Sequence, residues 1–208
     1  MDKIPLVYSV SRFGLWLWLK IWNRYRTIGA ENVPLEGGVI VASNHASYLD
    51  PPLVGCELTR RYVRFLARNT LFKNRLGQWW ARNVGVVFID RNRGDIAAFK
   101  AALGLLKEGG LLCLFPEGTR TLDGNLQPAK GGVGFLIMKA NVPVVPAYIE
   151  GNFSAFPKGA KLIKPSKIIV RYGKPILPEE FHGLGTDKEA YNKAAELVMA
   201  RITELKNR

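Results

Sequence analysis

The residues best suited to acid–base chemistry lie in one short segment of this 208-residue chain. The chain has two histidines, and His45 stands five residues before an aspartate in the sequence Asn-His-Ala-Ser-Tyr-Leu-Asp, residues 44–50. Imidazole is the side chain that exchanges a proton most readily near neutral pH. The Asp50 carboxylate can hold one ring nitrogen and leave the other as a general base. Asp50 before Pro51 also fits a helix N-cap, and the spacing alone does not decide between these interpretations.

A second segment combines groups that suit an anionic ligand. It reads Phe-Pro-Glu-Gly-Thr-Arg over residues 115–120. Its glycine allows close approach of the backbone, its arginine offers a two-pronged fork for phosphate, and its glutamate can hold that arginine or a substrate hydroxyl. A lysine ten residues further on adds positive charge. The residues expected to contact a phosphorylated ligand here are Glu117, Gly118, Thr119, Arg120 and Lys130.

Both segments follow short apolar runs that are typical of buried strands. Residues 39–42 precede His45, and residues 111–115 lead into the second segment. In α/β folds ligands bind at the carboxyl ends of strands, so we expect both segments at one edge of a sheet. Further strands are expected at 63–67, 84–89, 144–149 and 168–172, and helices at 95–107, 132–140 and from Thr186 onward. The sequence therefore predicts a single α/β domain with a mixed, largely parallel sheet flanked by helices.

Several other kinds of site are not indicated. The sequence has no G-x-x-x-x-G-K-[ST] phosphate loop and no G-x-S-x-G nucleophile motif. Cys56 and Cys113 lie far apart and lack the neighbouring ligands that a zinc site needs, and two isolated thiols suit a reducing cytosol. We expect no metal and no cofactor.

The amino-terminal region has the pattern of a helix that lies on a membrane. On a helical wheel its basic residues share one narrow side, while apolar residues fill the remaining arc. Tryptophan suits the headgroup layer because its ring is apolar and its N–H is polar. A helix that packs on the core is the alternative. Expected membrane contacts are Trp16, Trp18, Lys20, Trp22 and Arg24. We divide the chain into a helical membrane-interface segment at 1–30 and a main domain at 31–208, with its motifs at about 39–150.

The net charge of +13 indicates an anionic partner. Residues 60–93 contain nine basic residues against one acid, and residues 158–174 contain six basic residues and no acid. Anionic lipid and nucleic acid both fit this charge. The sequence has no zinc-finger spacing and no aromatic RNA-binding motif, and its basic clusters accompany a tryptophan-rich segment. This combination favours an anionic membrane surface over nucleic acid.

The sequence predicts contact with a membrane but no crossing. Its most apolar stretch, residues 4–22, is interrupted by Arg12 and Lys20, and it lacks a signal-peptide cleavage pattern. We therefore expect a peripheral protein on the cytoplasmic face of a membrane.

Four blocks, taken together, resemble the glycerophospholipid acyltransferase family, which includes lysophosphatidate acyltransferase. They are residues 44–50, 85–91, 115–120 and 142–146. One block alone is weak evidence, whereas four blocks in the right order are specific. The resemblance implies acyl transfer from a thioester of coenzyme A or acyl-carrier protein to a glycerolipid hydroxyl.

The same resemblance implies roles for individual residues. His45 would be the general base and Asp50 would orient it. Arg91 and residues 117–120 would bind the phosphate of the acceptor, as would Arg68, which stands where the family often has lysine. The expected reaction converts lysophosphatidic acid to phosphatidic acid. Because no serine or cysteine is placed to act as a nucleophile, we expect no covalent intermediate.

Other functions stay open at this point. The acceptor could be glycerol 3-phosphate or another lysolipid, such as a lyso-ornithine lipid. A hydrolase could use the same histidine to activate water, and a basic protein without catalysis could bind lipid or nucleic acid. His182 is expected in a surface loop without a role. Asn152 begins a glycosylation sequon that a cytoplasmic protein would not use.

Overall fold

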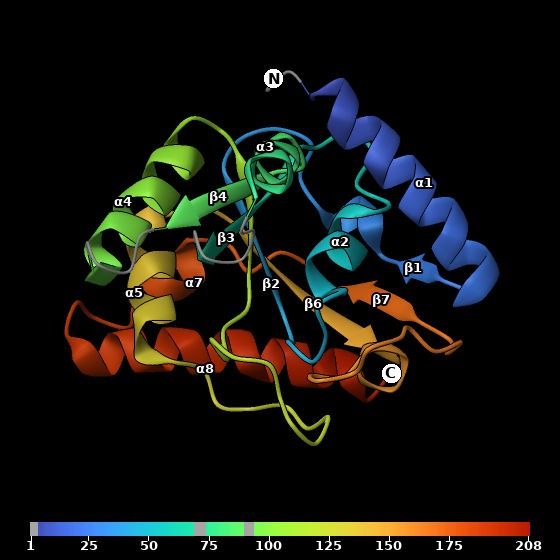
Figure 1. The fold of residues 1–208 in the computed structure, drawn as a ribbon. Helices are drawn as coiled ribbons and strands as arrows, with labels where there is room; N and C mark the ends of the chain where they lie inside the picture. The colour runs from blue at the N-terminus through green and yellow to red at the C-terminus, as the bar shows by residue number, and fades with distance from the viewer. Residues whose placement is uncertain (1–3, 69–73, 90–93) are drawn as a thin grey trace.

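Seven strands form one sheet in the order β1-β7-β6-β2-β5-β3-β4 (Figure 1). The computed structural model describes residues 4–68, 74–89 and 94–208. The five strands from β6 to β4 are parallel, β7 is antiparallel to β6, and β1 is parallel to β7. The predicted mixed, largely parallel sheet is confirmed. The strands are β1 (Arg26–Ile28), β2 (Val39–Ser43), β3 (Val63–Arg68), β4 (Val86–Ile89), β5 (Leu111–Leu114), β6 (Val144–Glu150) and β7 (Ile169–Tyr172).

The central strands β2 and β5 are almost entirely apolar because helices cover both faces of the sheet. Every residue of β2 and β5 is buried. Successive side chains of β2 enter different cores: Val39 and Val41 belong to one cluster, and Ile40 and Ala42 to the other. A nearly continuous apolar run is what a parallel strand buried on two faces requires.

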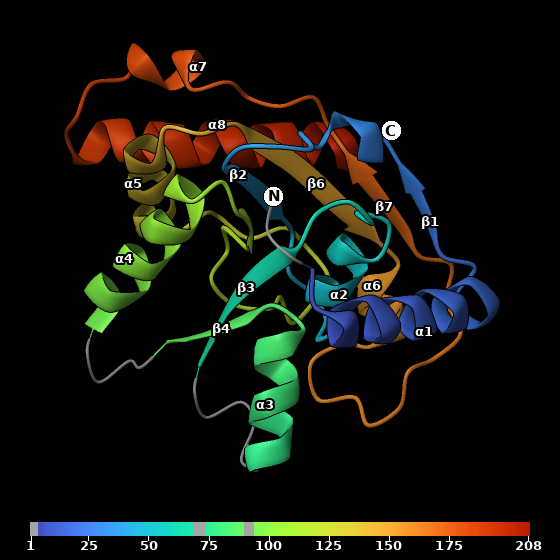
Figure 2. The ribbon, with the colours of Figure 1, turned by 90° about the horizontal axis from the view of Figure 1, so that it is seen from above.

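The helices form two layers on either side of the sheet (Figures 1 and 2). One face carries α1 (Leu6–Trp22) and α2 (Asp50–Gly55), and the other carries α4 (Gly94–Lys107), α5 (Gly131–Ala140) and α8 (Lys188–Lys206). Helix α8 packs along α5 and β6. Its buried residues recur every three or four positions, as expected for an amphipathic helix. The remaining helices are η1 (Ala30–Asn32), α3 (Arg75–Asn83), α6 (Asn152–Ala155) and α7 (Glu179–His182).

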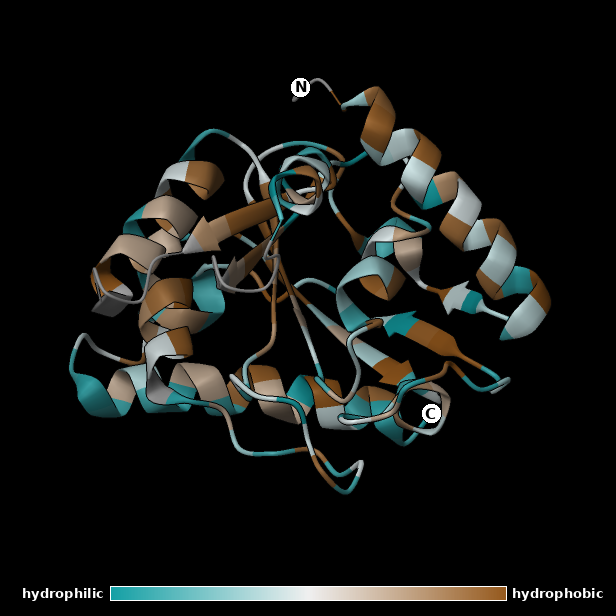
Figure 3. Cartoon of the chain, viewed as in Figure 1, coloured by the Kyte–Doolittle hydropathy of each residue, from teal (hydrophilic) through white to brown (hydrophobic). Residues whose placement is uncertain are grey.

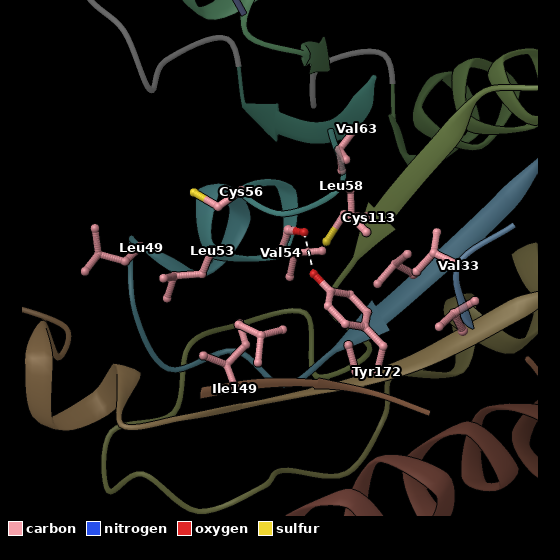
Figure 4. Close-up of a cluster of buried hydrophobic side chains, with 14 of the residues drawn as sticks. Val33, Leu49, Leu53, Val54, Cys56, Leu58, Val63, Cys113, Ile149 and Tyr172 are labelled. Atoms are coloured by element: carbon pink, nitrogen blue, oxygen red, sulfur yellow. Dashed lines mark hydrogen bonds between the residues drawn. The ribbon is translucent and has the colours of Figure 1, made fainter. Parts of the chain in front are cut away.

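Two buried tyrosines fasten α2 to the sheet. The hydroxyl of Tyr172, on β7, donates to the carbonyl of Val54 at 2.6 Å (Figure 4). The hydroxyl of Tyr25 donates to the carbonyl of Leu53 at 2.8 Å. Burial raises the pKa of both hydroxyls well above their usual value, so both remain donors. These bonds fix the helix that begins at Asp50.

Some predicted boundaries are wrong. The last helix begins at Lys188, because Asp187 and not Thr186 caps it; the Asp187 carboxylate accepts the N–H of Ala190 at 2.8 Å. Val84 caps the carboxyl end of α3 instead of beginning a strand. His182 closes the short helix α7, and its Nε2 lies 3.1 Å from Asn141 Oδ1.

The amino-terminal region is more closely joined to the domain than predicted. Strand β1 lies within residues 1–30 and pairs with β7, and Leu19 of α1 is fully buried in the core. Within the described residues, no helix is both long enough and apolar enough to cross a membrane.

Candidate active site

The two segments singled out in the sequence lie at the same edge of the sheet. Strands β2 and β5 are parallel neighbours, with Ala42 opposite Leu114, so their carboxyl ends lie side by side. The loops that follow are joined directly, because the N–H of Thr121 donates to the carbonyl of His45 at 2.9 Å. The expected shared edge is therefore present, and it brings an imidazole close to the loop that carries Arg120.

His45 and Asp50 form a hydrogen-bonded pair. His45 Nδ1 lies 2.8 Å from Asp50 Oδ2. The same carboxylate oxygen accepts the backbone N–H groups of Ala46 and Ser47, each at 2.7 Å. An ionised carboxylate only accepts hydrogen bonds, so we assign the ring proton to Nδ1. Nε2 then keeps its lone pair, as a general base requires.

The imidazole is held in place but remains accessible. Its ring stacks on Phe115, with 4.1 Å between the ring centroids and 17° between the planes. The His45 side chain is 18% exposed, whereas the Asp50 side chain is completely buried. Within the described residues, Nε2 has no hydrogen-bond partner. The nitrogen with the lone pair can therefore meet an incoming hydroxyl.

Glu117 is placed differently from the prediction. It was expected to hold Arg120 or a substrate, but it is only 2% exposed and contacts backbone groups. Its Oε1 accepts the N–H of His45 at 2.8 Å, and its Oε2 accepts the N–H of Gln127 at 3.0 Å. Burial raises the pKa of this carboxyl, while the two hydrogen bonds act in the opposite direction. Both oxygens are thus used to position loops, which replaces the expected contact with the acceptor.

The change Glu117→Gln should reduce turnover without weakening acceptor binding. One acceptor oxygen becomes an NH₂ group that faces a backbone N–H, so the loop that carries His45 must shift. A misplacement of this kind is expected to lower kcat by about tenfold or more, with KM for the acceptor nearly unchanged. Steady-state kinetics measure both constants. Gln127→Ala is the control, because it leaves that backbone N–H in place. A higher KM at unchanged kcat would instead assign Glu117 to substrate binding.

Arg120 stacks its guanidinium on the ring of Tyr48 and keeps one N–H donor without a partner in the described part of the chain. Its guanidinium carbon lies 3.3 Å from the centroid of Tyr48, and its Nη1 is buried without a hydrogen-bond partner in the described part of the chain. Cation–π contact fixes the position of such a group without using its N–H donors. Arg120 is therefore prepared to bind an anionic oxygen.

The other predicted phosphate contacts are partly brought together. Gly118 and Thr119 are exposed. The Lys130 side chain lies over Gly118, where an added Cβ would be 2.8 Å from Lys130 Cδ, and the φ of +65° at this position also favours glycine. Arg68 ends β3, the strand beside β5. Arg91 lies outside the described residues.

The predicted membrane contacts divide into two groups. Trp18, Trp22 and Arg24 are exposed, in agreement with a surface role. Trp16 and Lys20 instead contact Glu57. The Trp16 indole donates to the Glu57 carboxylate at 3.0 Å, and the Lys20 ammonium pairs with the same carboxylate at 2.9 Å. Trp16 and Lys20 are thus partly buried, and their polar groups are paired with Glu57.

An apolar cavity of about 380 Å³ lies beside the first block, between α1, α2 and the end of α3. Tyr48 and Pro51, which lie within two residues of Asp50 in the sequence, form part of its wall. The cavity therefore adjoins the segment that carries the His45–Asp50 pair. Other lining residues are Tyr8, Leu15, Phe65 and Val86.

One contact to the pair was not predicted. Asn152 donates from its side-chain amide to Asp50 Oδ1 at 2.7 Å. The sequence marks this residue only as part of a sequon. A usable signal was present, because Asn152 lies two residues after β6, and β6 ends at the same edge as β2.

Comparisons with known proteins identify relatives of this chain. A model of the Acyltransferase family matches residues 24–150. The chain is 28% identical over 190 residues to a Bacillus subtilis protein named 1-acyl-sn-glycerol-3-phosphate acyltransferase, covering 91% of this chain and 89% of that protein. It is 32% identical over 191 residues to a chloroplastic protein of the same name from Brassica napus, covering 88% of this chain and 54% of the relative. The chain thus spans about half the length of this plant relative.

A solved structure resembles the whole fold. The crystal structure of the 1-acyl-sn-glycerophosphate (LPA) acyltransferase from Thermotoga maritima superimposes with a TM-score of 0.78 at 29% sequence identity. The match covers 97% of this chain and 79% of the other.

Proposed function

The chain belongs to the Acyltransferase family, and on this premise we propose that it transfers a fatty acyl group from a thioester to the free hydroxyl of lysophosphatidic acid. The product is phosphatidic acid. The observation that carries the proposal is the His45–Asp50 pair at 2.8 Å, with Nε2 accessible. The names of the Bacillus and Brassica relatives support this choice of acceptor.

The proposed reaction is a direct transfer. The acceptor hydroxyl gives its proton to His45 Nε2 as its oxygen attacks the thioester carbonyl, so a C–O bond forms. The C–S bond then breaks, and the leaving thiolate takes the proton back from the imidazolium. Asp50 stabilises the imidazolium between these steps. Acyl-CoA and the acyl form of acyl-carrier protein are both thioesters, so either can serve as the donor in this reaction.

The surrounding side chains support a transfer without an acyl-enzyme. The Ser47 hydroxyl is buried and accepts the N–H of Leu49 at 3.0 Å. Burial raises the pKa of Cys56 to about 12 and that of Cys113 further, so both remain thiols. These groups are poor nucleophiles, which leaves the substrate hydroxyl as the attacking group.

The acceptor phosphate is proposed to bind at the loop of residues 118–120, where Lys130 lies over the exposed Gly118. Arg120 offers an unpartnered N–H, and guanidinium binds phosphate through a two-pronged fork. Lys130 adds a point charge above the loop. This arrangement holds the glycerol moiety beside the imidazole.

Arg120→Ala should raise KM for lysophosphatidic acid by about tenfold or more, since a charge-assisted hydrogen bond to phosphate is lost. The value of kcat should change little if the contact is equally strong in the ground and transition states. Steady-state kinetics with lysophosphatidic acid and with monoacylglycerol, which lacks the phosphate, measure the effect. Arg120→Lys should be intermediate, because it keeps the charge but not the fork. An equal rise in KM for both acceptors would contradict a phosphate contact.

The apolar cavity is proposed to receive an acyl chain. Its wall includes Tyr48, the residue that also holds Arg120. Burial of each CH₂ group contributes about 0.8 kcal/mol, so a chain in this cavity would be held firmly beside the first block.

We further propose that the outer side of α1 rests on an anionic bilayer, at the cytoplasmic face. Exposed apolar side chains follow one another at helical spacing, and apolar bands recur along α1 in Figure 3. The loop after α6 runs beside α1 (Figure 2), where Trp22 and Asn23 hold its backbone. The exposed apolar residues of α1 are Leu6, Val10, Phe13, Leu17 and Ile21. The exposed lysines of the loop are Lys158, Lys161, Lys164 and Lys167.

The double change Leu17→Glu with Ile21→Glu should reduce binding to vesicles of phosphatidylglycerol and phosphatidylcholine. It places two negative charges on the face proposed to enter the headgroup layer. Co-sedimentation measures the bound fraction. Ala200→Glu, on the exposed side of α8, is the control. Unchanged sedimentation of the double variant would remove α1 from the membrane surface.

A panel of acceptors tests the proposed substrate. The purified protein is assayed with lysophosphatidic acid, glycerol 3-phosphate and a lyso-ornithine lipid, with each donor type. We expect the highest kcat/KM with lysophosphatidic acid. A higher kcat/KM with another acceptor would identify that acceptor, and not lysophosphatidic acid, as the substrate.

A further inference from the structure

The Oδ1 oxygen of Asp50 accepts a hydrogen bond from a residue that lies outside all four sequence blocks. Asn152 Nδ2 donates to Asp50 Oδ1 at 2.7 Å, and Asn152 itself is only 3% exposed. We propose that Asn152 is a positioning residue of the acyl-transfer reaction, which orients the carboxylate that in turn orients His45. This inference rests on the proposed function, since it concerns the same imidazole.

The two oxygens of Asp50 have very different surroundings. Oδ2 accepts three hydrogen bonds, from two backbone N–H groups and from the imidazole. Oδ1 accepts one hydrogen bond, from Asn152. In a fully buried site an unpaired charged oxygen is costly, and the carboxylate would turn to find another donor. Asn152 removes that tendency and keeps Oδ2 directed at His45 Nδ1.

The orientation of the Asn152 amide is itself fixed. Its Oδ1 accepts the N–H of Phe153 at 2.9 Å, so the NH₂ end faces Asp50. Gly151, in front of it, has a φ of +80°, and a side chain there would collide with the carbonyl of Lys167. The glycine therefore allows the turn that directs Asn152 into the site.

The fourth sequence block belongs to the strand that positions Asn152. Residues 142–146 contain the start of β6, which is parallel to β2 and ends two residues before Asn152. Asn44, next to His45, ties the two strands together: it donates to the carbonyl of Ile149 at 3.0 Å and accepts its N–H at 2.7 Å. The register of β6 against β2 therefore sets the distance between Asn152 and Asp50.

The first test is Asn152→Ala, which leaves Oδ1 unpaired. We expect kcat to fall by about tenfold to a hundredfold, as a small misplacement of a catalytic group does, with KM for the acceptor nearly unchanged. Ser154→Ala, an exposed change in the same short helix, is the control and should behave as wild type. A wild-type kcat in a folded Asn152→Ala variant would overturn the proposal, as would an effect confined to KM.

The second test separates positioning from general structural damage. Asn152→Asp keeps the shape but places two carboxyl groups in contact. At lower pH they share one proton and keep the hydrogen bond, whereas at higher pH the second ionisation makes them repel. Among the described residues, the titratable groups that interact with the Asp50 carboxylate are His45, Cys113 and Glu117. Burial keeps the Cys113 thiol protonated, so the introduced carboxyl should dominate the new pH dependence.

We therefore expect the kcat of Asn152→Asp to decline in the alkaline range where wild type holds a plateau. A curve of wild-type shape, lowered by the same factor at every pH, would overturn the proposal. A second measurement needs no substrate. The NMR resonance of the His45 Nδ1 proton should shift in Asn152→Ala and not in Ser154→Ala. If the enzyme prefers a different acceptor, both experiments remain valid with that acceptor. A failure of the proposed substrate is thus distinguished from a failure of this inference.

Discussion

Replacement of His45 by alanine should lower kcat for acyl transfer by about 10²–10⁴-fold, the contribution of general-base catalysis. The acceptor hydroxyl is a poor nucleophile until its proton is removed, and Nε2 of His45 is the base with a free lone pair at this edge. The side chain is partly exposed and its ring contact is with Phe115. Folding should therefore survive the change, as near-wild-type circular dichroism and thermal unfolding would show.

The matched control for this change is His182→Ala. His182 lies on α7, where its ring contacts Asn141, away from the carboxyl edge. It should retain full activity. A folded His45→Ala protein that keeps more than a tenth of wild-type kcat would show that another group removes the proton.

The second large effect is expected for Asp50→Asn. The backbone N–H groups of Ala46 and Ser47 both point at Oδ2, so the carbonyl oxygen of the new amide should take that position, and its NH₂ group then faces the NH₂ group of Asn152. It can still accept from His45 Nδ1, and the tautomer is kept. The negative charge that stabilises the imidazolium is lost. We expect kcat to fall by about 10²-fold, less than the loss of about 10⁴-fold known where such a change also reverses the tautomer.

Three variants at this position separate charge from orientation. Asp50→Ala removes both and should be more severe than Asp50→Asn, while Asp50→Glu restores charge with poorer geometry. Single-turnover kinetics compare the chemical step in each. Equal activity of Asp50→Asn and wild type would mean that no charge develops on His45 in the transition state.

The local sequence indicated the His45–Asp50 pair but left a helix cap as the alternative, and the four blocks together favoured the pair. His45 and Asp50 are five residues apart, so a short loop and the first turn of a helix bring them together. Their shared edge with residues 115–120 followed from a general property of parallel strands. Both predictions depended on local spacing or on a rule of topology, and neither needed a specific tertiary contact.

Contacts between segments far apart in the chain could not be predicted from the sequence. Glu117 meets the N–H of His45 across 72 positions, and Asn152 meets Asp50 across 102. Which oxygen accepts which donor depends on the exact crossing of loops, which no periodicity encodes. The glutamate was therefore assigned to the substrate and the asparagine to no role in the site.

The helical wheel of the amino-terminal segment showed two faces but not which one packs inward. Trp16 and Lys20 lie on the side with Arg12, and all three reach toward the end of α2, where Glu57 and the carbonyl of Cys56 accept their hydrogen bonds. The apolar side consequently points outward. A helix with a partly buried polar side and an exposed apolar side differs from the usual amphipathic helix of a soluble protein, whose apolar side packs inward.

The stoichiometry of the wild-type reaction tests the central claim of direct transfer most directly. Free thiol and lipid products are measured together, with and without lysophosphatidic acid, and the protein is examined by mass spectrometry for a bound acyl group. The account predicts one thiol released per phosphatidic acid formed, little thiol release without acceptor, and an unmodified protein. Rapid release of free fatty acid without acceptor, or an acylated enzyme that passes its acyl group to the acceptor, would contradict it.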